Sequence, residues 1–505
     1  MGYARVRAVG LVGLEGHAVT VEAHVAAGLP ALVLSGLPDT SLNEARDRVR
    51  AAIVNAGEKW PQRRITINLL PAELPKRGSG FDLALAIVIL AGTGTLKLRG
   101  LAGAALIGEL GLDGQIRPVR GVLPMVLAAA RSGLRRIIVP AENAAEATLV
   151  PGVQVRAAAT LRQVIEFVRA SVPLPDPPTV SDIEDAAGPD LSDVLGQEQG
   201  RFALELAAAG QHHLALFGPP GAGKTMLAQR LPSILPPLDD AAALEVTAVH
   251  SIAGALPPVP QLIRRPPFQA PHHTASGPAI VGGGTGLARP GSLSLAHLGV
   301  LFLDEAPHFG VSVLNALRQP LEDGWVTVAR SQGCTRYPAR IQLVLAANPC
   351  ACGTGNDVSC TCSSVARRTY LNRLSGPLMD RIDLQVTLKP VGAAALLGQP
   401  GSQECSAQVL QRVITARQAA AERWAGQEFR VNARATGAVL RSQAFRLPKV
   451  ATAELAQRLD RGTLSARGYD RVLRVAWTIV DLDGRIAPDK RDVSEALDLR
   501  MGEAA

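Results

Sequence analysis

The chain has 505 residues, a formal net charge of +8, and a composition of 47% hydrophobic and 19% charged residues. This length exceeds what one hydrophobic core supports and indicates about three domains, and the composition excludes an intrinsically disordered chain. The positive charge is compatible with a polyanionic partner, but the aromatic content of 3% disfavours base stacking as the main contact with nucleic acid.

The sequence shows no segment that would carry the chain into a membrane. Its most apolar run, residues 83–91, is far shorter than the roughly 20 residues that span a bilayer, and no signal-peptide pattern follows Met1. Six cysteines are too few for a disulfide framework in a chain of this length. We therefore expect a soluble, cytoplasmic protein.

The first 170 residues alternate between two kinds of apolar pattern. Residues 19–25 and 64–70 have the pattern of strands, whereas residues 41–55 and 81–90 have the periodicity of helices. This mixture predicts an α+β domain over residues 1–170.

Proline and acidic residues dominate the next stretch, 171–190, which has almost no apolar periodicity and is predicted to be a linker. An α/β domain is expected over residues 191–392. Residues 393–505 are expected to form a helical domain, because helical periodicity continues through them. The expected helix stops in that domain are Gly426, Gly437 and Gly462.

The most specific motif is a glycine-rich loop between a strand-like run and a helix-like run. It fits the pattern G-x-x-x-x-G-K-[ST] of phosphate-binding loops. In such loops the backbone N–H groups point at phosphate oxygens, the lysine reaches the β- and γ-phosphates, and the final hydroxyl binds Mg²⁺. The pattern therefore predicts that the chain binds ATP with Mg²⁺. The loop residues are Gly218, Pro219, Pro220, Gly221, Ala222, Gly223, Lys224 and Thr225.

Two later apolar runs end in residues suited to nucleotide hydrolysis. Residues 300–303 are followed by Asp304 and Glu305, the Walker B pattern, in which the aspartate holds Mg²⁺ and the glutamate polarises the attacking water. Residues 343–347 are followed by Asn348, whose amide would lie beside the γ-phosphate and orient that water. A simple turn residue at a strand end is the alternative for Asn348. With the phosphate-binding loop, these residues predict an ATPase.

Four cysteines lie within 13 residues, directly after Asn348. Four thiolates can complete a tetrahedral Zn²⁺ shell, although a C-x-C spacing is tighter than that of common zinc motifs. Zinc binding is one interpretation, and reduced thiols in a loop or a redox function are the alternatives. The four residues are Cys350, Cys352, Cys360 and Cys362.

These motifs, with the helical region behind them, resemble the AAA+ ATPases. Around residues 268–383, several segments are similar to the magnesium-chelatase-like branch and more closely to the ComM/YifB family. Those segments are PFQAPHHTAS, VGGG, RPGSLSLAHLGVLFLDE, LRQPLEDG, AANPC and RLSGPLMDRIDL. The resemblance implies a P-loop α/β domain with a parallel sheet, a C-terminal helical lid, and a homohexameric ring with ATP between subunits.

The same resemblance assigns two arginines to catalysis. Arg381, in MDRIDL, would be the arginine finger that stabilises charge on the γ-phosphate held by a neighbouring subunit. Arg467, which opens an expected helix, is the candidate sensor 2. A surface salt bridge is the alternative for both side chains.

Two inserts would face the pore of such a ring. The first contains residues 282–286 with Arg289 beside them, and the second spans residues 324–341 with Arg330. Each would form a hairpin that pushes a substrate strand, and an ordinary flexible loop is the alternative for the first.

His272 and His273 follow each other directly. Adjacent histidine side chains should diverge, so we expect a structural or substrate-contact role rather than a shared metal.

The N-terminal domain carries a second resemblance. Residues 108–114, 116–121 and 135–140 resemble the proteolytic domain of Lon proteases, which use a Ser–Lys pair. Here Gly80 occupies the position of the serine and Leu123 that of the lysine. This implies a catalytically inactive Lon-protease-like scaffold with a role in binding or assembly.

The predicted function is an ATP-driven ring motor acting on single-stranded or branched DNA. ATP hydrolysis follows from the residues. The DNA substrate follows from the charge, the inserts and the resemblance, which implies a helicase that promotes branch migration in recombination and natural transformation. A chelatase-type metal-insertion motor, another AAA+ remodelling ATPase and an ATP-dependent protease are the alternatives. The Lon-like domain disfavours the chelatase, and the missing Ser–Lys pair disfavours the protease.

Overall fold

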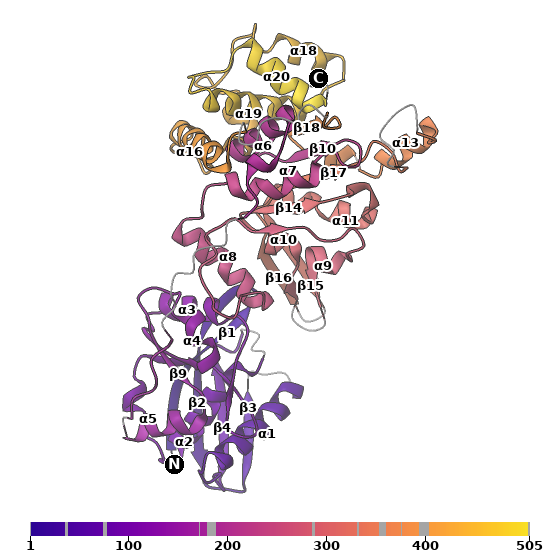
Figure 1. Ribbon diagram of the computed structural model, residues 1–505. Coiled ribbons are helices and arrows are strands. Elements are labelled where there is room, and N and C mark those ends of the chain that lie inside the picture. The colour runs from indigo at the N-terminus through magenta and orange to yellow at the C-terminus, as the bar shows by residue number, and fades with distance from the viewer. Residues whose placement is uncertain are drawn as a thin grey trace.

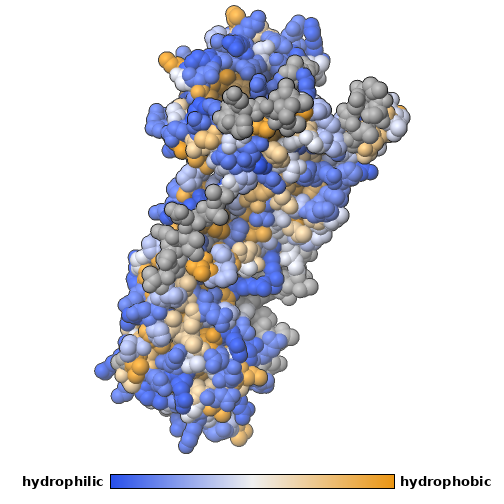
Figure 2. All heavy atoms as spheres, viewed as in Figure 1, coloured by the Kyte–Doolittle hydropathy of each residue, from blue (hydrophilic) through white to orange (hydrophobic). Residues whose placement is uncertain are grey.

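The protein is described from a computed structural model. The described residues are 2–35, 39–73, 78–170, 172–178, 188–284, 288–330, 333–352, 360–374, 376–392 and 403–502. Three units follow one another along an elongated molecule, with the N-terminal unit in indigo at one end and the C-terminal helices in yellow at the other (Figure 1). The surface facing the viewer in Figure 2 is mostly hydrophilic, with hydrophobic side chains scattered over it.

A seven-stranded mixed sheet forms the N-terminal unit. Its strand order is β3-β4-β2-β1-β5-β8-β9, and β2 pairs antiparallel with β1 and β4 while the other neighbours are parallel. The strands are β1 (Gly2–Val12), β2 (Glu15–Ala26), β3 (Ala31–Ser35), β4 (Arg64–Leu70), β5 (Ala104–Leu106), β8 (Arg136–Pro140) and β9 (Gln154–Ala158). A separate pair consists of β6 (Glu109–Leu110) and β7 (Ile116–Arg117).

Helices cover this sheet as the apolar pattern predicts. Nearly every residue of α2 is buried, because it packs against β1 and β2 while α1 covers its other side. The helices are α1 (Asp39–Asn55), α2 (Asp82–Gly92), α3 (Val122–Arg131), α4 (Ala144–Ala147) and α5 (Leu161–Ala170). The two predicted strands fall in β2 and β4, and the two predicted helices fall in α1 and α2, apart from the first residue of the second, which lies in a 3₁₀ turn. Leu174 of the predicted linker is buried in the core of this unit.

The central unit is a five-stranded parallel sheet of order β11-β14-β17-β10-β18. All residues of β14 and β17 are buried, as expected for strands covered on both faces. The strands are β10 (Leu214–Phe217), β11 (Phe268–Gln269), β14 (Val300–Leu303), β17 (Gln342–Ala347) and β18 (Leu384–Thr387). This order places the carboxyl ends of β10, β17 and β14 side by side.

Helices and two small hairpins surround the parallel sheet (Figure 1). The helices are α6 (Glu198–Gly210), α7 (Lys224–Arg230), α8 (Asp240–Ala253), α9 (Gly277–Val281), α10 (Ser292–Leu295), α11 (Val311–Ala316), α12 (Arg318–Asp323), α13 (Ser364–Leu371) and α14 (Gly376–Met379). The paired strands are β12 (Gly282–Gly283) with β13 (Arg289–Pro290) and β15 (Trp325–Arg330) with β16 (Gly333–Pro338). The N-terminal unit packs on this region through α3 and α8, where Ser251 donates a hydrogen bond to the buried carboxylate of Glu146.

The C-terminal unit is helical, as predicted. Its helices are α16 (Ser406–Arg423), α17 (Gly437–Leu440), α18 (Ala453–Asp460), α19 (Ala466–Leu482) and α20 (Lys490–Met501). The 3₁₀ turns of the chain are Ser79–Phe81, Leu98–Leu101, Ala141–Asn143, Leu191–Asp193, Leu231–Ile234, Ala306–His308 and Asn432–Arg434. The predicted fold class, an α+β unit, a parallel α/β unit and a helical C-terminus, is confirmed.

One predicted helix stop is wrong. Gly426 and Gly462 lie just beyond the ends of α16 and α18 with positive φ, but Gly437 is the first residue of α17. Thr436 caps that helix by accepting a hydrogen bond from the N–H of Val439. A Cβ at position 437 would overlap the Asp470 carboxylate and the Arg441 guanidinium, so the ends of these two side chains would have to move to admit another residue.

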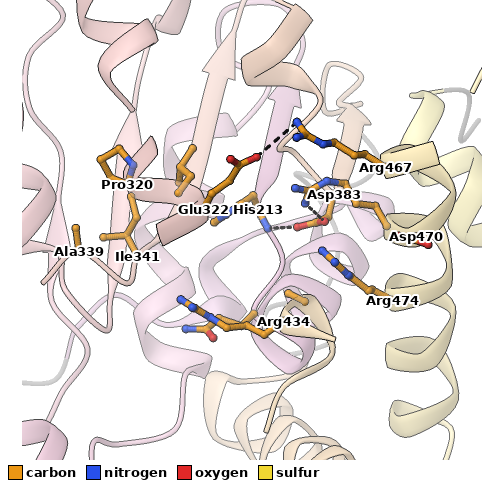
Figure 3. Close-up of a pocket in the computed structure, with 14 residues that line it drawn as sticks. His213, Pro320, Glu322, Ala339, Ile341, Asp383, Arg434, Arg467, Asp470 and Arg474 are labelled. Atoms are coloured by element: carbon orange, nitrogen blue, oxygen red, sulfur yellow. Dashed lines mark hydrogen bonds and ion pairs between the residues drawn. The ribbon is translucent and has the colours of Figure 1, made fainter. Parts of the chain in front are cut away.

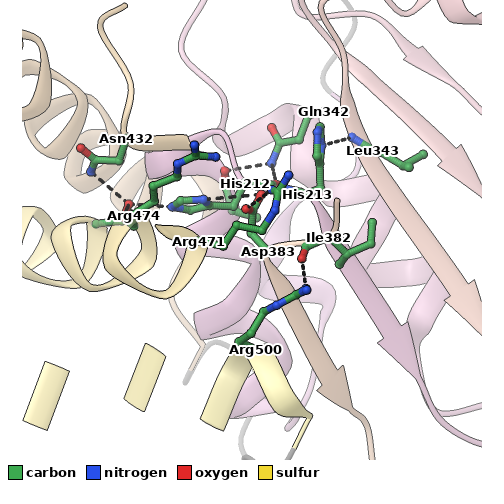
Figure 4. Close-up of polar contacts among 12 residues, drawn as sticks. His212, His213, Gln342, Leu343, Ile382, Asp383, Asn432, Arg471, Arg474 and Arg500 are labelled. Carbon is green, nitrogen blue, oxygen red and sulfur yellow. Dashed lines mark hydrogen bonds and ion pairs between the residues drawn. The ribbon is translucent and has the colours of Figure 1, made fainter. Parts of the chain in front are cut away.

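A buried ion pair joins the C-terminal helices to the parallel sheet (Figure 4). Asp383, which precedes β18 and is 1% exposed, accepts hydrogen bonds from Arg471 of α19 at 2.5 Å and from the N–H of His213 at 2.9 Å. Burial alone would raise the pKa of this carboxyl group, but the charge of Arg471 and the contact with His212 hold the pKa well below its usual range. The pair therefore stabilises the folded chain above the unfolded-state pKa of about 3.9, and this contribution is lost as the pH falls through the folded-state pKa.

Removing this carboxylate should destabilise the protein strongly. Asp383→Asn leaves the Arg471 guanidinium buried without a counter-charge, which should lower the free energy of unfolding by about 3–5 kcal/mol. Asp470→Asn, next to Arg471 on α19, is the control. It breaks a pair with the exposed Arg441 side chain and should cost no more than about 1 kcal/mol. Urea unfolding at pH 7, followed by tryptophan fluorescence, measures both, and equal losses would contradict the role given to Asp383.

Candidate nucleotide site

The phosphate-binding loop lies between β10 and α7, as its sequence predicts. β10 ends at Phe217, and α7 begins at Lys224. Gly221 and Gly223 both have φ in the left-handed region, at 76° and 86°. A Cβ would meet no atom within 4 Å at either position, so the requirement for glycine there comes from the backbone conformation and not from space.

Lys224 links this loop to the neighbouring strand. Its ammonium group donates to the carbonyl oxygens of Gly218 at 2.7 Å and Pro219 at 2.8 Å, and to Oδ1 of Asn348 at 2.9 Å. The side chain is mostly buried, and desolvation lowers the pKa of its amine. None of the three acceptors carries a negative charge that would neutralise the lysine. An anionic phosphate can therefore compete with them for the ammonium group.

Thr225 and Asp304 come together across the same edge of the sheet. The Thr225 hydroxyl donates to Oδ2 of Asp304 at 2.7 Å. A hydroxyl and a carboxylate are hard oxygen ligands of the kind that Mg²⁺ prefers, so these two residues fit a magnesium ion brought in with ATP. Glu305 follows with a φ of 49°, a left-handed conformation that is uncommon outside glycine and marks a constrained position at the strand end.

These residues line a single cavity of about 740 Å³. Its walls contain the loop residues Gly221, Gly223 and Lys224, the acidic pair Asp304 and Glu305, and Asn348. This volume is within the range of about 300–1,000 Å³ found for small-molecule sites. The geometry thus joins three motifs that lie up to 130 residues apart in the sequence into one place where a nucleoside triphosphate can bind.

The histidine pair is part of this cavity, and the expectation that its side chains diverge is wrong. The rings of His272 and His273 lie 4.2 Å apart between centroids. Nδ1 of His273 is 3.3 Å from a carboxylate oxygen of Glu305. The sequence gives only a weak signal for this wall of the cavity, namely two histidines shortly after the short strand β11. The position of these histidines depends on how the chain returns across the sheet.

Arg381 and Arg467 meet outside this cavity. Arg381 donates to the carboxylate of Glu322 at 2.7 Å, and Arg467 lies 3.6 Å from the same oxygen. Arg381 is buried, and its Nε has no hydrogen-bond partner among the residues described, whereas the Arg467 side chain is 68% exposed. Neither arginine is among the described residues that line the nucleotide cavity of the same chain.

The four clustered cysteines converge in space. The Sγ atom of Cys350 lies 3.0 Å from that of Cys352 and 3.4 Å from that of Cys360. All four sulfur atoms, including that of Cys362, lie within 4.8 Å of one another. No disulfide joins these cysteines in the described part of the chain, and four sulfurs at these separations match the donor set of a tetrahedral structural zinc site.

The two predicted inserts contain short hairpins. β12 pairs with β13, where Arg289 is exposed, and residues 285–287 lie outside the described chain. In the second hairpin the guanidinium of Arg336 lies 4.8 Å from the centroid of the Trp325 ring. The side chain of Arg330 lies outside the described residues.

The residues at and beside the two positions of the Lon-type pair have structural contacts in the N-terminal unit. Leu123 is fully buried, and its N–H donates to Glu146 at 2.9 Å. Ser79, one residue before Gly80, donates to the carboxylate of Glu109.

No helix within the described ranges is long and apolar enough to cross a membrane.

Family models match three parts of the chain. Residues 190–396 match the model described as magnesium chelatase, subunit ChlI, residues 21–143 match subunit ChlI of Mg-chelatase, and residues 403–500 match the ChlI C-terminal model. A partial similarity extends to Lon protease of Mycolicibacterium smegmatis, which is 32% identical over 149 residues, or 28% of this chain and 19% of that protein.

Several relatives match over almost their whole length. An uncharacterised protein of Mycobacterium tuberculosis is 51% identical over 501 residues, which cover 99% of each chain. The uncharacterised protein YifB of Escherichia coli is 43% identical, covering 97% of this chain and 95% of its own. Competence protein ComM of Haemophilus influenzae is 42% identical, covering 97% and 96%. With this degree of identity over both chains, and with the phosphate-binding loop, acidic pair and Asn348 at one edge of a parallel sheet, the chain belongs to the ComM/YifB family of magnesium-chelatase-like AAA+ proteins.

Proposed function

We propose that this protein is an ATP-driven, ring-forming motor that acts on DNA, with helicase activity that promotes branch migration during recombination. The observation that supports hydrolysis is the convergence of Lys224, Thr225, Asp304, Glu305 and Asn348 on one cavity. DNA as substrate is supported by the net charge of +8, the two hairpins of the ATPase unit, and the relationship to a protein named for competence.

Each site residue has a defined role in this proposal. Lys224 moves from its carbonyl and Asn348 acceptors to the phosphates, and Thr225 and Asp304 hold Mg²⁺. Glu305 polarises the attacking water, and Asn348 orients it once the lysine has left the amide oxygen. The backbone N–H groups of Gly221 and Gly223 face the phosphates in this proposal. The other loop residues, Gly218, Pro219, Pro220 and Ala222, shape the loop around them, and the two prolines have no N–H to donate.

The proposed homohexamer gives Arg381 and Arg467 their function. Both side chains are outside the cavity of their own chain and already share one anionic partner, Glu322. In a ring they would turn to the γ-phosphate held by the neighbouring subunit, as arginine finger and sensor 2, and stabilise the negative charge that develops there.

The proposed zinc ion would be structural. Cys350, Cys352, Cys360 and Cys362 follow β17 directly, so a bound Zn²⁺ would fix the segment that leaves Asn348 and leads to α13. A closed shell of four thiolates leaves no open coordination position for catalysis.

DNA should stimulate ATP hydrolysis by this protein. Contacts to phosphates predict binding that weakens steeply with salt and varies little with base sequence. Arg289→Ala should reduce the stimulation and leave basal hydrolysis largely unchanged, whereas Arg99→Ala, an exposed arginine of the N-terminal unit, should affect neither. Glu305→Gln should bind ATP but lower turnover by a factor of about 10² or more with or without DNA.

ATPase assays and strand displacement on forked and three-stranded DNA, with ATP or a non-hydrolysable analogue, test this proposal. If no DNA structure changes the rate of ATP hydrolysis but a porphyrin with a metal does, the chelatase-type motor is favoured. This motor is the second candidate because the ChlI family models match the chain. Cleavage of unfolded protein would favour the protease instead.

Subunit mixing should restore activity between two inactive variants. Arg381→Ala and Lys224→Ala rings should each be inactive alone, because one lacks the finger and the other the phosphate contact. Mixed rings should recover part of the ATPase activity, since some interfaces combine an intact Lys224 with an intact Arg381. If mixed rings form and no mixing ratio restores hydrolysis, Arg381 does not act across the subunit boundary.

The purified chain should contain about one Zn²⁺ by elemental analysis. The double variant Cys350→Ser and Cys352→Ser should lose the metal and unfold at lower temperature. Replacing Cys405 by serine is the control, because that residue lies outside the cluster. Metal-free protein of unchanged stability would support reduced thiols.

A further inference from the structure

A second cavity, of about 310 Å³, lies at the opposite edge of the parallel sheet from the nucleotide site. Its walls include His213, Ile341 and Asp383, which directly precede β10, β17 and β18 and therefore mark the amino ends of these strands. Helix α19 closes the other side with Arg467 and Arg474 (Figure 3). The nucleotide site is at the carboxyl ends, so the length of the strands separates the two cavities.

Four arginines and three carboxylates line this cavity, and all three carboxylates are already paired. Asp383 holds Arg471, and Asp470 holds Arg441, which lies outside the cavity. Glu322 holds Arg467 together with Arg381, which is likewise outside. Burial lowers the pKa of His213 to about 4, so its imidazole is neutral at pH 7 and adds no charge.

Two arginines are left without a carboxylate. Within the described ranges, no acidic side chain lies at ion-pair distance from Arg434 or Arg474. Arg474 donates through Nε to the carbonyl of Ala435 at 2.8 Å, whereas no described residue accepts a hydrogen bond from the Arg434 side chain. The two side chains come from different elements, the 3₁₀ turn Asn432–Arg434 and helix α19, and both line the same cavity (Figure 3).

Guanidinium groups are well suited to binding phosphate, because their planar donors match its oxygens in pairs. Arg474 is half-buried, and the protein around it screens its charge less than water does, which strengthens its attraction for an anion. Arg434 is exposed and accessible from solvent. A volume near the lower end of the small-ligand range suits a few phosphate groups but not a nucleic-acid strand.

We propose that this cavity is a binding site for a small polyphosphate, held by Arg434 and Arg474, with Arg467 at its rim. The carboxylate of Glu322 competes with a bound phosphate for Arg467, because it already forms an ion pair with that side chain. The phosphate groups could belong to an anion free in solution or to a nucleotide presented by the neighbouring subunit of a ring. The inference is independent of DNA as the substrate, since it uses none of the residues assigned to DNA.

Calorimetric titration with inorganic tripolyphosphate tests this site. The titrated protein carries Lys224→Ala, which removes the phosphate contact of the nucleotide site. In this background, Arg434→Gln should weaken binding at least tenfold, because it removes a cation whose side chain has no ion-pair or hydrogen-bond partner among the described residues. Glu322→Gln should tighten binding severalfold, because it removes the competing charge. Arg461→Gln, an exposed arginine at the end of α18, is the matched control and should leave binding unchanged.

Circular dichroism before each titration shows whether the variants are folded, and Arg434→Lys should restore part of the affinity if charge is the cause. Repeating the titration at a dilution that dissociates rings separates the two sources. Binding that persists on dilution identifies a free anion as the ligand, and binding that disappears identifies a phosphate presented across the subunit boundary. Equal affinities for the Arg434→Gln and Arg461→Gln proteins, or no binding to the parent in either state, would overturn the proposal.

Discussion

The position of β17 between β10 and β14 is the constraint on which the rest of the site depends. In a parallel sheet all strands end at the same edge, so the residue that follows each strand meets its neighbours there. With β17 in the middle, the Asn348 amide reaches Lys224 on one side while Asp304 reaches Thr225 across the same edge. Any other strand order would separate the cation of the loop from the carboxylates and the amide.

The interior of the sheet makes this order rigid. β14 and β17 are buried along their full length, so sliding either strand would expose apolar side chains to water. The polar residues are therefore displaced to the strand ends, where the chain leaves the core. The left-handed backbone of Glu305 is one result, because the chain must turn sharply as soon as β14 ends.

The amino edge of the same sheet is organised by charge rather than by apolar packing. Asp383 binds Arg471 in the core. The neighbouring arginines of α19 and of the 3₁₀ turn Asn432–Arg434 line the cavity beside this ion pair. Helix α19 thus has two functions in the fold, since its apolar face packs on α6 and α16 while its arginines face the cavity. A change in the relative position of sheet and helices would therefore alter both the ion pair and the cavity.

The sequence alone determined the element types, the fold class and the residues of the nucleotide site, because each depends on local pattern. Apolar periodicity defined β4 and α2, and the fixed spacing around Lys224 defined the loop. Prediction from the sequence failed where the local structure depends on residues that are far away in the chain. Gly437 begins a helix that the Thr436 side chain caps, and the rings of His272 and His273 lie close together in the wall of the cavity. Only the tertiary structure decided that Arg381 and Arg467 share Glu322, that four cysteine sulfurs meet, and that Arg434 and Arg474 face one cavity. These contacts join residues that are far apart in the chain, and their energies depend on burial and charge that no local pattern encodes.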